Sequence, residues 1–213
     1  MAEQPVWKSG ITLAAIATVC TLLVAGTWQL THQRIEENRK AFLERSLAPA
    51  LAGLFFDSGV TESKITIPPP HDLPGKEAAL IYRVYADELP VAALFVVTAR
   101  DGYAGPIRLL IGVTMDGEIT GVRVLEHRET PGLGDRVEIE KSDWVLQFDG
   151  RSLGDPTPKQ WGVKEDGGEF DQLSGATVTP RAIVKAIKAT LTYFELNSEA
   201  IFSAPADAVE ESE

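Results

Sequence analysis

Cysteine is almost absent from this sequence, which contains one, Cys20, among 213 residues. A single thiol cannot close an internal disulfide. It also cannot form a thiolate cage for zinc or an iron–sulfur cluster from the chain's own residues. Histidine is scarce as well, because His32, His71 and His127 are scattered and show no ligand spacing. We therefore expect no metal bound by the chain itself.

Clusters of basic residues are absent too. The chain has 20 lysines and arginines against 31 acidic residues, and its net charge is −11. Nucleic-acid binding depends on clustered positive charge that neutralises phosphates, so this balance argues against a nucleic-acid partner. The last residues, SAPADAVEESE, are acidic and have no periodic apolar face. We expect residues 199–213 to form a disordered acidic tail.

Charge is missing altogether from residues 9–31, SGITLAAIATVCTLLVAGTWQLT. A helix of this length crosses the hydrocarbon core of a membrane with room to tilt. Trp7 and Trp28 lie near its ends, where interfacial tryptophans are common. We predict a retained transmembrane helix after a short flank, residues 1–8, with membrane lipid around it.

Two other interpretations of this apolar run are weaker. A cleaved signal peptide has a shorter apolar region followed by a small-x-small cleavage site, which this sequence lacks. A lipid-modified Cys20 is disfavoured because Val19 precedes it and the apolar run continues beyond it. The flanking charges leave the orientation open, since Lys8 precedes the run and basic residues interleaved with acidic ones follow it.

The rest of the chain predicts an α+β domain over residues 56–198. A helix over residues 32–55 leads away from the span, with Pro49 near its end, and a proline-rich loop follows at residues 65–77. Runs of β-branched and aromatic residues then predict strands. These runs are residues 79–86, 90–99, 108–115 and 119–127, with a hairpin turn at 116–118. We expect one antiparallel sheet with helices packed on it.

The last helix is predicted from apolar residues at helical spacing between Ile183 and Phe194. We expect it to begin near Pro180, with Thr179 as its N-cap, and to run for about four turns. Trp144 lies in another amphipathic segment. We interpret it as a core residue rather than as an aromatic residue of a functional site.

Three glycine-containing clusters interrupt this pattern: GYAGPI at 102–107, ETPGLGD at 129–135 and SGAT at 174–177. Glycine lets the backbone approach a ligand closely, although each cluster taken alone is also compatible with an ordinary turn. SGAT precedes the last helix, whose free N–H groups and positive dipole end favour a phosphate. The sequence contains neither a P-loop nor a dinucleotide-binding glycine pattern.

The stretch Asp171-Gln172-Leu173-Ser174-Gly175-Ala176-Thr177 resembles the D-x-x-[ST]-G-A-T signature of the FMN-binding domain family. In that family a flavin transferase joins FMN, through its phosphate, to the hydroxyl of the last threonine. The resemblance therefore implies one covalent FMN on Thr177, with Ser174, Gly175 and Ala176 beside it. It also implies that Asp171 and Ser174 serve recognition by the flavin transferase.

The other two clusters resemble further recurrent blocks of the same family. This resemblance implies that Glu129, Thr130 and Leu133 line the isoalloxazine, with Tyr103 and Gly105 nearby. A carboxylate in contact with the ring would disfavour its anionic reduced forms and so lower its potential. The resemblance implies no catalytic residue, because the flavin carries the electrons.

The whole chain, anchor included, resembles the G component of the Rnf complex, which couples electron transfer between ferredoxin and NADH to ion movement. The implied setting is the bacterial inner membrane, with the flavin domain in the periplasm and other membrane subunits of that translocase as partners. The C component of the sodium-translocating NADH:quinone reductase is related, and usually longer. The alternatives are that component, a membrane-tethered binding or assembly module without a redox role, or a flavin bound without a covalent link.

Overall fold

The computed structural model describes residues 6–51, 53–56 and 60–206. It forms two units, Met1–Leu43 and Glu44–Glu213. Helix α1, Val6–Ala50, makes up the described part of the first unit and ends in the second. Within the described residues, one helix, Gly10–Ala50, is long and apolar enough to cross a membrane.

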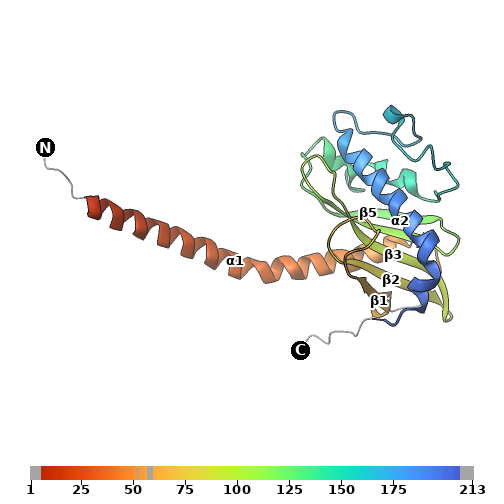
Figure 1. Ribbon diagram of the computed structural model, residues 1–213, viewed down its shortest axis with the longest axis horizontal. Coiled ribbons are helices and arrows are strands. Elements are labelled where there is room, and N and C mark those ends of the chain that lie inside the picture. Colours follow the sequence, from red (N-terminus) through yellow and green to blue (C-terminus); the bar gives the residue numbers. More distant parts are fainter. Residues whose placement is uncertain (1–5, 52, 57–59, 207–213) are drawn as a thin grey trace. The chain divides into compact units, whose positions relative to one another are not determined.

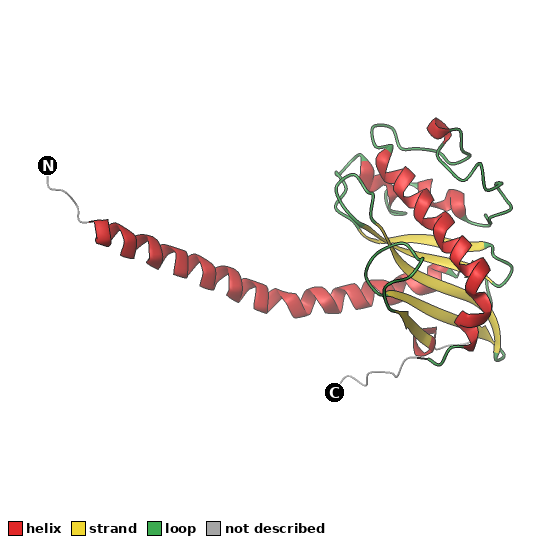
Figure 2. Ribbon diagram, in the orientation of Figure 1, coloured by secondary structure: helices red, strands yellow, loops and turns green. Residues whose placement is uncertain are grey.

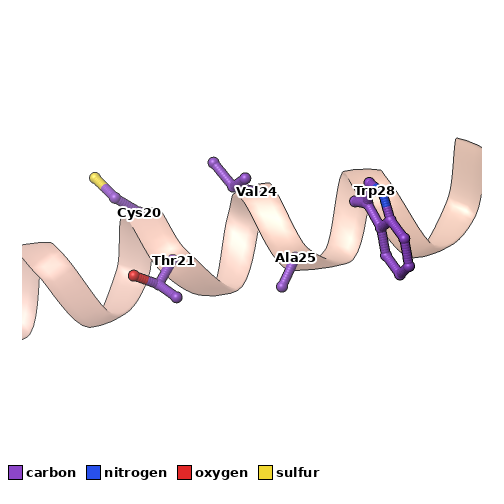
Figure 3. A pocket seen from close by; sticks show the side chains of 5 residues that line it. All are labelled: Cys20, Thr21, Val24, Ala25 and Trp28. Carbon is purple, nitrogen blue, oxygen red and sulfur yellow. The ribbon is translucent and has the colours of Figure 1, made fainter. Parts of the chain in front are cut away.

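Threonine hydroxyls in the apolar part of α1 are satisfied within the helix. The hydroxyls of Thr18, Thr21, Thr27 and Thr31 each donate to the carbonyl oxygen four residues earlier. A hydroxyl bonded in this way needs no water, which suits a helix surrounded by lipid. The five side chains in Figure 3 form a shallow apolar groove on this helix, where Cys20, Thr21 and Ala25 are small beside Val24 and Trp28.

Helix α1 is continuous where the sequence predicted a span at 9–31 and a separate helix at 32–55. It ends at Ala50, earlier than predicted, and Pro49 lies in its last turn. Side chains of the sheet satisfy its last carbonyls, since Thr120 donates to the Ala50 oxygen and Arg123 to the Pro49 oxygen. The predicted flank falls mostly outside the described residues, which begin at residue 6.

Five antiparallel strands form one sheet in the order β1-β2-β3-β4-β5. The strands are β1 Lys64–Ile67, β2 Ala79–Ala86, β3 Leu89–Ala99, β4 Ile107–Thr114 and β5 Ile119–Glu126. The α+β prediction is confirmed, and β2 to β5 lie close to their predicted bounds. The sequence missed β1, a four-residue edge strand that was assigned to the proline-rich loop.

Tight turns explain the register of the central hairpins. Asp87 and Glu88 connect β2 to β3, and both have positive φ, 49° and 65°. Two left-handed central residues define a type I′ turn, whose twist matches that of paired strands. Gly117, with φ 82°, lies in the predicted turn between β4 and β5.

Helix α2, Val178–Ser203, lies across one face of the sheet (Figure 1). Its apolar side chains join one core with alternate residues of the central strands; Phe194, for example, packs edge-on against Phe95 of β3. Between β5 and α2 the chain forms loops and short helices (Figure 2). From this stretch Trp144, Phe148 and Phe170 enter the same core.

The structure corrects both ends of the predicted last helix. Its N-cap is Thr177, and α2 extends over 26 residues to Ser203, which corrects the expected four turns and the start of the disordered tail. Arg83, itself buried, donates to the carbonyl oxygens of Ile201 and Ala204 and so holds the end of the helix. The remainder of the predicted tail, residues 207–213, lies outside the described residues.

The last turn of α1 packs on the opposite face of the sheet. A Cβ on Gly112 of β4 would lie 2.7 Å from the Ala50 oxygen, and one on Gly121 of β5 would lie 3.2 Å from the Ala50 Cα. The two glycines are paired across β4 and β5, so the sheet has no side chains at the position where the helix packs. Leu47, Ala50 and Leu51 are buried there.

Candidate functional site

The three glycine-containing clusters meet at the N-terminal end of α2. Glu129 joins them, because its Oε1 accepts the Ala104 N–H at 3.1 Å and its Oε2 accepts the Thr179 hydroxyl at 2.7 Å. Glu129 is only 5% exposed. One buried carboxylate therefore bonds the loop before β4 and the start of α2 to the loop after β5.

The SGAT cluster forms a tight turn immediately before α2. The Ala176 N–H donates to the Leu173 oxygen at 3.0 Å, and Gly175 has φ 79°. A positive φ at the third position is typical of a type II turn and favours glycine. The turn exposes Ser174 and Gly175, while Leu133 lies against it, 3.3 Å from the place of a Gly175 Cβ.

Thr177 is the N-cap of α2, yet its hydroxyl makes no capping hydrogen bond. The N–H groups of Val178 and Thr179 belong to the first turn and have no acceptor within the helix, and Pro180 has no N–H at all. The positive end of the helix dipole lies at the same place. A half-buried hydroxyl thus stands beside donors suited to an anion.

Exposed apolar side chains lie in or next to each of the three clusters. Tyr103 is 72% exposed, Leu133 44% and Val178 41%. Tyr103 precedes Ala104 in the sequence, and Val178 follows Thr177. Leu133 instead touches the SGAT turn in space. Apolar groups beside an anion site suit a ligand that has both an aromatic ring and a phosphate.

Asp171 is held by its main chain and presents its side chain to solvent. Its carbonyl oxygen accepts the indole N–H of Trp144 at 2.6 Å, and its N–H donates to Gln147 Oε1 at 2.7 Å. The carboxylate is 65% exposed and pairs with Lys164. Trp144 is buried against Phe148, so the prediction that it is a core residue is confirmed.

A second polar network supports the loop after β5. His127 Nδ1 accepts the Glu129 N–H at 2.9 Å, so Nε2 carries the proton that is donated to Glu138 Oε1 at 2.6 Å. Lys141 bonds Glu138 at 2.8 Å and Asp135 at 2.9 Å. The hydrogen bond from Lys141 lowers the pKa of Asp135, and the bonds to Glu138 and Asp135 raise the pKa of Lys141.

Sequence reasoning named the three clusters that the structure brings together but missed the polar network that supports the loop after β5. It considered His127 only as a metal ligand and gave no role to Glu138 or Lys141. The spacing of Glu138 and Lys141, three residues apart, was the available indication of an ion pair. Gly105, which has φ 130°, lies in the loop before β4, next to the bonded Ala104.

Comparison with known proteins identifies the family. Residues 102–192 match the FMN-binding domain, and residues 1–49 match the RnfG N-terminal region. The G component of the ion-translocating oxidoreductase complex of Shewanella baltica (strain OS223) is 42% identical over 204 residues, 95% of this chain and 96% of the relative. The proteins of the same name from Pseudomonas aeruginosa (strain UCBPP-PA14) and Shewanella piezotolerans (strain WP3 / JCM 13877) are 42% and 40% identical.

These alignments extend over nearly the full length of both partners, since the Shewanella piezotolerans protein aligns over 99% of this chain and 100% of its own length. The FMN-binding match contains all three clusters that meet at α2. The chain therefore belongs to the RnfG family, the G components of ion-translocating oxidoreductase complexes, and carries an FMN-binding domain.

Proposed function

We propose that this chain is the membrane-anchored flavoprotein subunit of an Rnf-type ion-translocating ferredoxin:NAD oxidoreductase, and that it relays electrons through one FMN attached covalently to Thr177. The observation that carries the proposal is the position of Thr177. Its hydroxyl makes no capping bond and stands at the N-terminus of α2, directly after the exposed SGAT turn and beside the exposed Val178.

The residues present fit FMN. The first-turn N–H groups of α2 would hold the phosphate, and a phosphoester to Thr177 would replace one phosphate oxygen. Leu133, Thr130 and Tyr103 would line the isoalloxazine, with Gly105 leaving room beside the ring. The flavin supplies the electron-transfer chemistry when bound, while the chain supplies position and excludes water.

Attachment is a group transfer without a change of oxidation state. An O–P bond forms between the Thr177 hydroxyl oxygen and the FMN phosphorus, and the phosphoanhydride bond of an activated flavin nucleotide breaks. The nucleotide leaving group and the hydroxyl proton depart. Asp171 and Ser174 are exposed beside Thr177, which supports a role in recognition by the flavin transferase.

The proposed setting is a bacterial inner membrane, with α1 as a single span and the flavin domain in the periplasm. The exposed apolar surface of α1 supports contact with lipid and with other membrane subunits. Small residues such as Cys20, Thr21 and Ala25 let a neighbouring helix approach closely. Cys20 serves there as a small apolar residue.

The proposal is tested on the full chain made in its membrane together with a flavin transferase. Flavin fluorescence in a gel after full denaturation should give a band for the wild type and for Thr192→Ala, an exposed threonine of α2. The band should disappear in Thr177→Ala, because the acceptor hydroxyl is gone.

Each of the other outcomes supports a different function for the chain. A dark wild-type band from folded protein, with the transferase active on another substrate, contradicts covalent attachment. Flavin that then leaves with the denaturant points to a noncovalent cofactor, and a chain that never holds flavin is a tethered binding or assembly module. A wild-type band with assembly into a quinone-reducing, sodium-pumping complex would favour the related C component of the NADH:quinone reductase.

A further inference from the structure

Glu129 is a buried carboxylate in the proposed flavin site, and both of its oxygens are hydrogen-bonded. It is 5% exposed, and each carboxylate oxygen already accepts a hydrogen bond from the protein. An ionised carboxylate is expensive to bury unless such bonds satisfy it. A side chain engaged in this way is directed into the protein, toward the elements that it connects.

The two donors to Glu129 come from distant parts of the chain. Ala104 lies 25 residues before it, in the loop that contains Tyr103 and Gly105, and Thr179 lies 50 residues after it, in the first turn of α2. Thr179 is two residues from the attachment residue Thr177. The carboxylate therefore fixes the distance between the proposed ring-binding loop and the proposed phosphate site.

The surroundings of Glu129 hold the carboxylate in one place. A Cβ on Gly134 would lie 2.7 Å from Glu129 Oε2 and 3.2 Å from Thr179 Oγ1, so the loop closes directly over this hydrogen bond. The main chain of Glu129 is bonded to His127, which is in turn bonded to Glu138. The Glu129 side chain therefore cannot turn toward solvent without losing these hydrogen bonds.

We propose that Glu129 is a positioning residue that acts on the flavin through Thr179 and Ala104 rather than through direct contact with the ring. The Glu129–Thr179 hydrogen bond keeps the phosphate end of the site at a fixed position relative to the ring end. This inference rests on the proposed function and refines it, because the family resemblance assigned Glu129 to the ring.

The two roles of Glu129 predict different results for two single variants. Glu129→Gln removes the charge but keeps both contacts, because its amide oxygen can accept the Ala104 N–H and its amide N–H can donate to the Thr179 hydroxyl oxygen. Thr179→Val removes the hydroxyl and leaves the charge in place. If Glu129 acts by position, Thr179→Val breaks the hydrogen bond and loosens the flavin, whereas Glu129→Gln keeps the bond and the flavin stays held. If it acts by its charge on the ring, only Glu129→Gln has an effect.

The experiment uses the full, flavinylated chain in detergent and reads the flavin itself. Fluorescence anisotropy reports how firmly the attached ring is held, and redox titration reports its midpoint potential. We expect Thr179→Val to raise the mobile fraction of the flavin roughly fivefold, the effect of losing one buried hydrogen bond, and Glu129→Gln to leave it near the wild-type value. Thr179→Ser keeps the hydroxyl and should restore the wild-type anisotropy, and Glu140→Ala, an exposed carboxylate, should not change it.

Two results would overturn the inference. One is wild-type anisotropy in Thr179→Val. The other is a Glu129→Gln protein whose potential shifts while its anisotropy stays unchanged, which would assign Glu129 to the ring. If Glu129→Gln does not fold, the comparison of Thr179→Val with Thr179→Ser decides the question. A wild-type chain without covalent flavin contradicts the proposed function instead, so the two failures are distinguishable.

Discussion

At the scale of single residues, Gly134 shows how tightly the loop after β5 closes on Glu129. Its φ is not in the left-handed region, so its requirement for glycine comes from packing alone. A Cβ there would lie 2.7 Å from Glu129 Oε2 and 3.0 Å from Glu129 Cβ. Because the carboxylate is bonded on both oxygens, it cannot move aside without losing a hydrogen bond.

We predict that Gly134→Ala lowers the free energy of unfolding by about 1–3 kcal/mol, the usual cost of overpacking a dense site. Gly154→Ala is the control, since the nearest atom to a Cβ there is Ser152 Oγ at 3.8 Å. Urea denaturation of both variants in detergent measures the difference. Equal stabilities for the two variants would contradict the packing described around Glu129.

The sequence singled out Thr177 as the proposed attachment residue and wrongly assigned the N-cap of the last helix to Thr179. A recurrent motif marked Thr177, whereas Thr179 was assigned as an N-cap because threonine before proline commonly begins a helix. That preference is local and tolerates a shift of two residues, since Pro180 fits anywhere in the first turn. The hydroxyl of Thr179 instead donates to Glu129, 50 residues away. No local pattern encodes a hydrogen bond between such distant residues.

At the scale of elements, the sequence predicted what short-range rules govern. Strands β2 to β5 followed from apolar, β-branched runs separated by turn residues, which leave few other arrangements. Strand β1 was missed because four residues beside a proline-rich loop give too short a pattern. The end of α2 was missed because Arg83, on β2, stabilises its last carbonyls from a distant part of the chain.

The loop that carries ETPGLGD should depend on pH through Asp135. The hydrogen bond from Lys141 lowers the pKa of this carboxyl below its ordinary value of about 3.9. A carboxylate whose pKa is lower in the folded state stabilises the fold above the unfolded pKa. That contribution is lost as the pH falls through the folded pKa.

We therefore predict that Asp135→Asn is less stable than the wild type at pH 7 and that the difference shrinks as the pH falls below about 4. Urea denaturation in detergent between pH 7 and pH 3 measures it. Asp143→Asn removes an exposed carboxylate outside this network and serves as the control. A difference that stays constant over the whole range would mean that Asp135 is not stabilised as a charged partner of Lys141.

At the scale of the whole molecule, the charges flanking the span and the family resemblance disagree about orientation. Lys8 precedes the span, and Arg34, Arg39 and Arg45 follow it, so a count of basic residues places the C-terminal domain in the cytoplasm. The count of basic residues predicts orientation poorly when a long domain is translocated. Acidic residues are also interleaved with these arginines. The proposed setting places the flavin domain in the periplasm, so the orientation of the chain tests that part of the proposal.

Cysteine labelling can decide the orientation because the chain has one native cysteine, Cys20, within the span. In a Cys20→Ala background, Glu199→Cys marks the exposed C-terminal part of α2, and Glu3→Cys marks the N-terminal flank. We predict that a membrane-impermeant maleimide labels Glu199→Cys in intact spheroplasts and labels Glu3→Cys only after the membrane is opened. The reverse pattern would place the flavin domain in the cytoplasm, where the basic residues after the span would have determined the orientation. The proposed periplasmic relay would then be wrong, although the assignment of the FMN-binding domain and the proposed attachment to Thr177 would not be affected.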